Sequence, residues 1–384
     1  MNDGPLPRVI HVTMAQGTQG STLLRVAERL CEAYERAGGS AAVAVPTGSV
    51  TERAHVLPVP YGAVRFDEPA LRRDVVIGRL GRLRPHFGHV YDPAIEVVGR
   101  APCDLVVLYE GHYAAASLPQ WEPLRRNGTR VCLYVHNRLS RSYGRTELRR
   151  LLGHADRVVF VSEHQRVEAE ERLGRGHGLD LAVVHNGVDE LFLAEGPRPA
   201  PNGEFVVTFI GNVVAVKGPH LVAQAADLAA QLTGRPFRVR IVGDSWYGRG
   251  GLSPYESWLR EQSATLATPV DFVPRQDRFG VAEELRGASA ACLPSEYEAL
   301  SMAVLEAMAS ALPVVCSDIP AMREAGGDAV LARPREDVEA LADALASLAE
   351  DPERYAERSR LSWERAQLFS WDRAAHQLAT LSTA

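Results

Sequence analysis

Residues 294–309, PSEYEALSMAVLEAMA, place two glutamates on either side of a predicted helix start. Ser301 is a typical N-cap residue, and most of residues 302–310 are good helix formers. Glu298 therefore falls on the loop before the helix, and Glu306 falls in its second turn. Backbone N–H groups at a helix N-terminus favour anions such as phosphate. A carboxylate on each side of that position can accept hydrogen bonds from hydroxyl groups.

The two glutamates alone would also fit an ordinary surface helix, because glutamate is common on exposed helix faces. The residues that follow favour a ligand site. Pro313 to Cys316 form a short apolar run that predicts a buried strand, followed by a turn and another helix start. A helix followed by a parallel strand is typical of an open α/β sheet, in which ligands bind at the carboxyl ends of the strands.

The chain contains 42 basic residues, and Lys217 is its single lysine. Against this heavy use of arginine, a lone lysine indicates a position that needs a compact point charge on a flexible stem. Phe205 to Ile210 predict a buried strand, Gly211 begins a turn, and Pro219 occupies a typical first helical position. Lys217 is therefore expected near a second helix N-terminus, where phosphate groups bind. The alternative is a surface lysine without a function.

Length and composition indicate a soluble globular protein of two domains. The 384 residues exceed one typical core, and 46% hydrophobic with 23% charged residues is ordinary for soluble chains. No apolar run is long enough for a membrane span, and Arg8 to Thr13 predict a first strand rather than a signal peptide. The five cysteines are scattered without metal-ligand spacing, which predicts buried free thiols in a cytoplasmic protein.

Alternating strand and helix patterns occur in both halves of the chain. Strands are predicted first at VIHVTM, AAVAVP, DLVVLYEG, RVCLYVHN, DRVVFVSE and LAVVHNGVD, and later at FVVTFIGN, RVRIVGD, VDFVPR, ASAACLPS and PVVCSD. The segment EGPRPAPNGE is rich in Pro and Gly and predicts an interdomain linker. We therefore expect two doubly wound α/β domains with a cleft between them. The expected parts are residues 1–190, a linker at 191–204, residues 205–365 and a terminal helix within 366–384.

Residues 292–324 resemble the donor-site signature of retaining GT-B glycosyltransferases of family 4, also called glycosyl transferases group 1. The matching positions are Pro294, Ser295, Glu298, Glu306, Ala307, Met308, Pro313, Val314, Val315 and Glu324. One stretch departs from the family pattern, since the usual Gly-Phe-Gly-Leu is replaced by Ala299, Leu300, Ser301 and Met302. The resemblance implies that this stretch contacts the donor through backbone amides, which such a replacement preserves.

The resemblance implies a GT-B fold, in which two Rossmann-like domains face each other across a cleft. It also implies that the last helix, within 366–384, crosses back to the first domain. A terminal helix that packs on the second domain is the alternative. Lys217 and Gly218 match the family segment G-R-x4-K-G, whose basic residues contact the donor diphosphate. Asn212 stands where the family has arginine, so this chain has one fewer positive charge at that contact.

The resemblance further implies a retaining glycosyltransferase that uses a nucleotide diphosphate sugar, with a UDP- or GDP-sugar as the first expectation. Lys217 and the helix N-terminus near Ser301 would neutralise charge on the leaving diphosphate. Glu306 would hold ribose hydroxyls, and Glu298 would hold hydroxyls of the sugar ring. The acceptor hydroxyl would attack from the face that the phosphate leaves, with a phosphate oxygen as its base. No Asp-x-Asp motif occurs, so neither a metal ion nor another cofactor is expected.

Further candidates in the first half follow predicted strands. His136 ends VCLYVH, where the family often has a histidine near the transferred sugar, so we count it with Lys217 and Glu298 as a catalytic candidate and also place it on the acceptor side. A hydrogen-bonded histidine at a strand end is the alternative. Glu110 and His112 end another strand and are acceptor-side candidates of the same kind.

Glycines mark the remaining candidate positions. Gly17 and Gly20 flank a loop after the first strand, which in the family approaches the donor phosphates (Gly17) and the acceptor (Gly20). A tight turn that needs glycine is the alternative. In the second half, Gly243 ends one strand, and Val273 and Arg275 end another, where the family holds the nucleobase. Arg275 could stack on the base through its planar guanidinium.

The acceptor and other partners stay open. A small molecule, a lipid-linked sugar, a glycan and a natural product all fit. The arginine- and alanine-rich composition is typical of a bacterium with a GC-rich genome, for which a natural-product acceptor is one expectation. Residues 72–89 predict a basic amphipathic helix, which fits a solvated surface, contact with the inner face of a membrane, or contact with an anionic acceptor. No nucleic-acid partner is expected, and the oligomeric state is not predicted. Two other functions remain: a sugar-nucleotide epimerase of the same fold, and a non-catalytic protein that binds sugar nucleotides.

Overall fold

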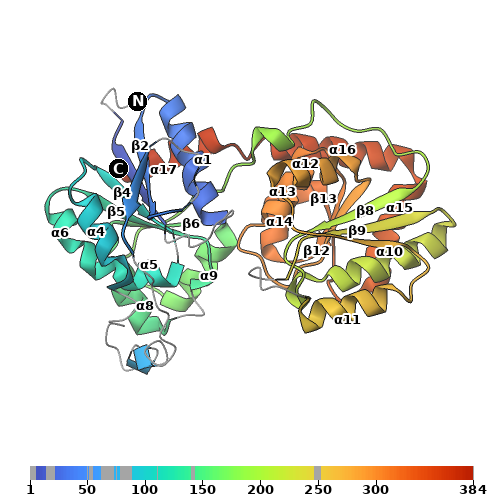
Figure 1. Ribbon diagram of the computed structural model, residues 1–384, viewed down its shortest axis with the longest axis horizontal. Coiled ribbons are helices and arrows are strands. Elements are labelled where there is room, and N and C mark those ends of the chain that lie inside the picture. The colour runs from blue at the N-terminus through green and yellow to red at the C-terminus, as the bar shows by residue number, and fades with distance from the viewer. Residues whose placement is uncertain are drawn as a thin grey trace. The chain divides into compact units, whose positions relative to one another are not determined.

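The computed structural model describes residues 6–13, 22–49, 51, 55–61, 73–74, 76–77, 89–109, 111–139, 143–245 and 252–383. The chain divides into two compact units, and each has a parallel sheet with helices around it (Figure 1). Unit 1 comprises residues 1–187 and 371–384, and unit 2 comprises residues 188–370.

Within the described residues, unit 1 contains a seven-stranded parallel sheet in the order β3-β2-β1-β4-β5-β6-β7. The strands are β1 (Arg8–Val12), β2 (Ser40–Pro46), β3 (Val56–Val59), β4 (Leu105–Leu108), β5 (Arg130–Val135), β6 (Arg157–Phe160) and β7 (Leu181–Val183). The central strand β4 reads LVVL and is buried throughout, as expected where helices cover both faces of a parallel sheet. The strand order reverses between β1 and β4, and such a reversal opens a crevice at the carboxyl edge.

The helices of unit 1 are α1 (Thr22–Arg36), α4 (Asp92–Val98), α5 (Gly111–Ser117), α6 (Glu122–Arg126), α8 (Arg145–Leu152), α9 (Glu163–Leu173) and α17 (Trp371–Thr383), with 3₁₀ turns η1 (His89–Tyr91) and η2 (Leu118–Trp121). Helix α17 packs against α1 from the opposite end of the sequence. An ion pair of 2.6 Å joins Arg36 Nη2 to Asp372 Oδ1 across this contact. The last helix of the chain is therefore part of unit 1.

Within the described residues, unit 2 contains a six-stranded parallel sheet in the order β10-β9-β8-β11-β12-β13. The strands are β8 (Phe205–Ile210), β9 (Phe237–Val242), β10 (Val270–Val273), β11 (Ala290–Leu293), β12 (Val314–Ser317) and β13 (Val330–Arg333). The strand order reverses between β8 and β11, where Val207 pairs with Ala290. The loops that follow these two strands therefore border a crevice of the kind that holds ligands in open α/β sheets.

The helices of unit 2 are α10 (Pro219–Thr233), α11 (Pro254–Ser263), α12 (Arg278–Gly287), α13 (Met302–Ala309), α14 (Pro320–Gly326), α15 (Val338–Glu350) and α16 (Pro352–Ala366), with 3₁₀ turns η3 (Glu190–Phe192), η4 (Ala215–Lys217) and η5 (Gly327–Ala329). Helix α10 packs against α15, and α13 packs against α16, so that helices cover both faces of the sheet (Figure 1).

The sequence-based prediction of the strands is confirmed for β1, β2 and β4 to β12, including the edge strands β7 and β10. The strands β3 and β13 were not predicted, and both lie at an edge of their sheet. Two local predictions are also confirmed: Ser301 is the N-cap of α13, and Pro219 is at the first helical position of α10.

The segment expected to link the domains, residues 191–204, is part of unit 2 and is fastened to it. The Ala194 N–H donates to the Ala309 carbonyl at 2.8 Å, and Trp363 Nε1 donates to the Ala194 carbonyl at 2.9 Å. The Arg198 N–H donates to Ser359 Oγ at 2.7 Å. These bonds hold the segment along α13 and α16, because its backbone polar groups need partners.

No helix among the described residues is long and apolar enough to cross a membrane. All five cysteines are free thiols, as predicted, and four of them are buried, with Cys103 half-buried. Burial raises the pKa of Cys132 and of Cys316 to about 12, so these thiols stay protonated and inert at neutral pH.

Candidate functional site

Lys217 and Glu298 form an ion pair beyond the carboxyl ends of two neighbouring strands. Lys217 ends η4, which follows β8, and Glu298 lies on the loop that follows β11. The Lys217 Nζ atom is 2.6 Å from Glu298 Oε1. Both side chains are half-buried, with exposed fractions of 25% and 16%. The pair thus occupies the place where the order of the strands reverses.

Hydrogen bonds within its own loop, and from that loop to the end of β12, hold Glu298 in place. Ser295 Oγ donates to Glu298 Oε1 at 2.8 Å. Ser317 Oγ, at the end of β12, donates to the Ser295 carbonyl at 2.5 Å. The carboxylate is therefore anchored through Ser295 to the ends of both β11 and β12, which restricts its rotation.

Gly218 allows the Lys217 loop to touch the Glu298 loop. Its φ is +73°, and a Cβ atom built there would lie 2.5 Å from the Pro294 carbonyl oxygen. A side chain is thus excluded both by the backbone conformation and by the contact. The Glu296 N–H donates to the Val216 carbonyl at 2.8 Å, which joins the two loops again.

Glu306 lies in the second turn of α13, as predicted, and is 9% exposed. Ser301 caps this helix, since its Oγ accepts from the Val304 N–H at 3.4 Å. Arg278, on the helix α12, lies near Glu306: Arg278 Nη1 is 3.9 Å from Glu306 Oε1. Arg278 also forms an ion pair with Asp189. Arg278 was not predicted as a site residue, because no local pattern distinguishes it among so many arginines.

Four further predicted residues lie at or just beyond the ends of β8, β9 and β10. Gly243 packs against Gly211, where an added Cβ would lie 2.0 Å from the Gly211 carbonyl oxygen. The Gly243 N–H donates to the Val273 carbonyl at 3.0 Å. Arg275 is exposed two residues beyond β10. Asn212 directly follows Gly211, and its carbonyl accepts from the Val214 N–H at 2.9 Å.

In unit 1, His136 follows β5 and lies among aromatic rings. Its ring centroid is 5.5 Å from that of Tyr109 and 4.4 Å from that of Tyr134. The residue is half-buried, but its Nε2 atom is enclosed and has no hydrogen-bond partner among the described residues. Burial lowers the pKa of His136 to about 3, so the ring is neutral at physiological pH. A neutral imidazole ring can form hydrogen bonds to hydroxyl groups.

A buried histidine and tyrosine that were not predicted support this group. His11 Nδ1 lies 2.5 Å from the hydroxyl of Tyr109, and both residues are almost fully buried. Tyr134 donates to the Val184 carbonyl at 2.7 Å. His11 and Tyr109 lie on or next to β1 and β4, where the strand order of unit 1 reverses. A polar residue inside an apolar strand, such as His11 in RVIHV, was the available signal.

Some predicted candidates lie outside the described residues. They are Gly17, Gly20, Glu110, and most of residues 72–89. His112 is the second residue of α5, and only its backbone belongs to the described part of the chain. Among the described residues, no cluster of three or more His, Cys, Asp or Glu side chains could hold a metal ion.

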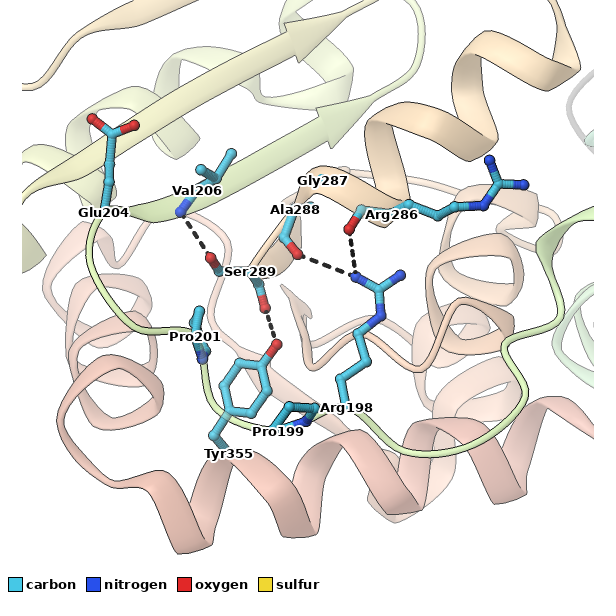
Figure 2. A pocket seen from close by; sticks show the side chains of 10 residues that line it. All are labelled: Arg198, Pro199, Pro201, Glu204, Val206, Arg286, Gly287, Ala288, Ser289 and Tyr355. Atoms are coloured by element: carbon cyan, nitrogen blue, oxygen red, sulfur yellow. Dashed lines mark hydrogen bonds between the residues drawn. The ribbon is translucent and has the colours of Figure 1, made fainter.

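A pocket of about 490 Å³ lies near the amino ends of β8 and β11, at the edge of the unit 2 sheet opposite to Lys217 and Glu298 (Figure 2). Its polar groups bond one another. Arg198 Nη1 donates to the carbonyls of Arg286 and Ala288 at 3.0 and 3.3 Å, and the Tyr355 hydroxyl donates to the Ser289 carbonyl at 2.9 Å. Arg198 thereby satisfies carbonyls at the end of α12, which is a structural role.

Two sequence families match the chain, one for each unit. The family described as "Glycosyltransferase Family 4" matches residues 24–190, and "Glycosyl transferases group 1" matches residues 195–362. The chain belongs to these GT-B glycosyltransferases, and the resemblance noted from residues 292–324 is confirmed.

Solved structures share the fold over nearly the whole chain. Sucrose-phosphate synthase from Thermosynechococcus elongatus aligns with a TM-score of 0.73 and 17% identity, covering 98% of each chain. HepE from Anabaena, in complex with UDP and glucose, aligns with a TM-score of 0.71 and 19% identity, covering 98% of this chain and 100% of that one. The GT-B fold is therefore confirmed.

Curated relatives are more similar in sequence but match a shorter part. The D-inositol 3-phosphate glycosyltransferase of Rhodococcus erythropolis is 31% identical over 238 residues, which are 59% of this chain and 53% of the relative. The enzyme of the same name from Mycobacterium avium is 32% identical over 239 residues, with 58% and 54% covered. The chain thus spans about half the length of the curated relatives it matches.

Proposed function

We propose that this glycosyltransferase retains the configuration of the sugar that it transfers and takes the sugar from a nucleotide diphosphate donor. The observation that supports the proposal most directly is the 2.6 Å ion pair between Lys217 and Glu298. It combines a cation suited to a diphosphate with a carboxylate suited to sugar hydroxyls, at the strand ends where open α/β sheets bind ligands.

Lys217 has the role of stabilising the leaving diphosphate. Charge grows on the leaving group as the bond to the sugar breaks, and a positioned ammonium group lowers the energy of that state. When the donor binds, its phosphates become a second partner of the Lys217 ammonium. Glu298, still anchored by Ser295 Oγ, then accepts hydrogen bonds from hydroxyls of the sugar ring.

The nucleoside part of the donor is assigned to the neighbouring strand ends. Glu306 accepts hydrogen bonds from the ribose hydroxyls, and the backbone near Val273 together with Arg275 contacts the base. Several solved structures of similar fold are described with UDP or as UDP-forming, so a UDP-sugar is the first donor to test.

For the acceptor, we propose a small polyhydroxylated molecule. The curated relatives are named for D-inositol 3-phosphate, and similar folds belong to sucrose-phosphate and trehalose-phosphate synthases. The neutral ring of His136 suits such an acceptor or the transferred sugar, because it can hydrogen-bond to hydroxyls without carrying a charge. Lipid-linked sugars, glycans and natural products are the alternatives.

A thermal-shift screen with UDP, GDP, dTDP and ADP and their common sugar conjugates tests the donor site. A ligand at about a hundred times its dissociation constant stabilises the folded state by about 2.7 kcal/mol, which gives a visible rise in Tm. We expect one nucleotide to stand out, and UDP first. The absence of a shift with all of them would contradict the proposed donor site.

A non-catalytic protein that binds sugar nucleotides is the second candidate, because Asn212 removes one positive charge from the expected diphosphate contact. Turnover separates the two. The donor found in the screen is incubated with D-inositol 3-phosphate, glucose 6-phosphate and a set of polyols, and release of the nucleoside diphosphate is followed. Binding of the donor without release in the presence of any acceptor favours the second candidate.

A further inference from the structure

The two loops that carry Lys217 and Glu298 are bridged by a residue from a third loop. Arg335 lies two residues beyond β13, the edge strand of the unit 2 sheet, and its side chain is 17% exposed. Its Nε donates to the Pro294 carbonyl at 3.0 Å, and its Nη2 donates to the Ala215 carbonyl at 2.7 Å. Pro294 begins the loop of Glu298, and Ala215 begins the 3₁₀ turn of Lys217.

We propose that Arg335 is a positioning residue for the transfer reaction, which sets the distance between the Lys217 loop and the Glu298 loop through these two hydrogen bonds. The inference rests on the proposed function of Lys217 and Glu298. Arg335 itself contacts neither the donor nor the acceptor, and it acts only by holding the two loops.

The chemistry of the guanidinium group fits this role better than that of any other side chain. It is planar and has five N–H donors in a fixed arrangement, so it can bond two carbonyl groups at a defined angle. A lysine ammonium at the end of a flexible stem would not fix the separation of two carbonyls in the same way. The remaining Nη1 of Arg335 forms an ion pair with Glu336, whose side chain is 72% exposed.

The Lys217 loop needs such a support. Ala215 and Val216 are exposed, and η4 is a single 3₁₀ turn rather than part of a longer helix. The contact of Gly218 with the Pro294 carbonyl oxygen shows that the two loops meet at the carbonyl that Arg335 binds. Displacement of a catalytic group by about 1 Å can lower the rate about a hundredfold, so a small relaxation of this turn is enough to affect transfer.

The test measures how strongly the protein binds UDP and uridine, by calorimetry, in four forms: wild type, Arg335→Ala, Lys217→Ala and the double variant. GDP and guanosine replace them if GDP is the nucleotide found in the screen. We expect Arg335→Ala to weaken binding of the diphosphate about tenfold and to leave binding of the nucleoside unchanged. In the Lys217→Ala background, Arg335→Ala should cause little further loss, since both changes act on the same contact.

Two control variants separate positioning from general effects. Arg360→Ala removes an exposed arginine of α16 that pairs with Glu364, and Glu336→Gln removes the acidic partner of Arg335 without touching its bonds to the two carbonyls. Both should bind the diphosphate like the wild type. Hydrogen exchange of amides in residues 211–218 and 294–301 should become faster in Arg335→Ala and stay unchanged in both controls.

Several results would overturn the inference. Equal losses of diphosphate and nucleoside binding would indicate a general structural role, and additive losses in the double variant would show that Arg335 does not act through Lys217. Arg335→Met, which keeps the aliphatic stem, replaces Arg335→Ala if the latter does not fold, and unfolding of both variants would show that the bonds hold unit 2 as a whole. If Lys217→Ala binds the diphosphate like the wild type, the proposed function is contradicted. If Lys217→Ala binds the diphosphate more weakly but Arg335→Ala does not, only the role of Arg335 is contradicted.

Discussion

Glu298 Oε1 accepts from two donors at once, Lys217 Nζ at 2.6 Å and Ser295 Oγ at 2.8 Å. Lys217 is 81 residues away in the sequence, and Ser295 is three residues away. The carboxylate is thus fixed by its own loop and by the loop of a neighbouring strand. Both loops must be in place before a donor can contact the lysine and the glutamate together.

Replacement of either member of this pair should lower turnover strongly. We expect Lys217→Ala and Glu298→Gln each to reduce kcat/KM by tens- to thousands-fold, the range found when contacts to a transition state are lost. Steady-state kinetics with the donor from the screen would measure it. The exposed surface variant Arg360→Ala, in which the ion pair with Glu364 is lost, should keep wild-type rates. Wild-type kinetics in Lys217→Ala would exclude its role at the diphosphate.

Glu306→Gln should weaken binding of the nucleotide, because the proposed contact of Glu306 with the ribose hydroxyls is lost. A hydrogen bond to a charged group contributes about 1.5–3 kcal/mol, so the loss should be about ten- to a hundredfold for UDP. The 2′,3′-dideoxy analogue of UDP, which lacks the hydroxyls, should bind the variant and the wild type equally. A similar loss for both ligands would mean that Glu306 acts on the fold, for example through Arg278, and not on the ribose.

Gly218→Ala should destabilise the protein more than Gly234→Ala does. Both glycines have left-handed backbone angles, with φ of +73° and +64°, and alanine costs about 1–2 kcal/mol in that conformation. Only at position 218 does the new Cβ also collide with the Pro294 carbonyl, at 2.5 Å, while position 234 has open space. The difference in Tm between the variants measures the contact between the loops. Equal Tm values in the two variants would show that the loops of Gly218 and Pro294 can move apart without loss of stability.

Most strands of both sheets, and the positions of Lys217, Glu298 and Glu306 relative to the strands and helices of unit 2, were predictable from local sequence. A run such as FVVTFI is apolar except for Thr208 because the strand is covered on both faces, and Ser301 is recognisable as an N-cap residue from its side chain alone. The edge strands β3 (VLPV) and β13 (VLAR) are short and partly exposed, so their pattern is weak.

Partners that are distant in the sequence were beyond the reach of local patterns. Arg278, Arg335 and the pair of His11 with Tyr109 gain their importance only from contacts made when the strands assemble. In a chain with 42 basic residues, almost all arginine, a single arginine has no local signature. Lys217 was recognisable because it is the exception to this usage and because it follows a predicted strand and turn.

Turnover should persist in the presence of a chelator. The proposed mechanism assigns the charge of the leaving diphosphate to Lys217 and to helix N-termini, and no Asp-x-Asp motif occurs in the sequence. Rates measured before and after incubation with excess EDTA should agree within a factor of two or so. Complete loss with EDTA that added Mg²⁺ or Mn²⁺ restores would contradict a metal-free mechanism.

The free energy of unfolding should decrease as the pH is lowered, because His136 takes up a proton more easily in the unfolded chain. Burial lowers the pKa of this histidine from 6.5 to about 3, so between these values the unfolded chain binds a proton that the folded chain does not. The contribution to stability is therefore complete above about pH 6.5 and is lost progressively as the pH falls towards 3. We expect the free energy of unfolding, measured with urea at pH 7.5 and at pH 4.5, to decrease less in His136→Phe than in the wild type. An equal decrease in the two proteins would show that His136 is protonated as easily in the folded chain as in the unfolded one, and that its ring is not enclosed in solution.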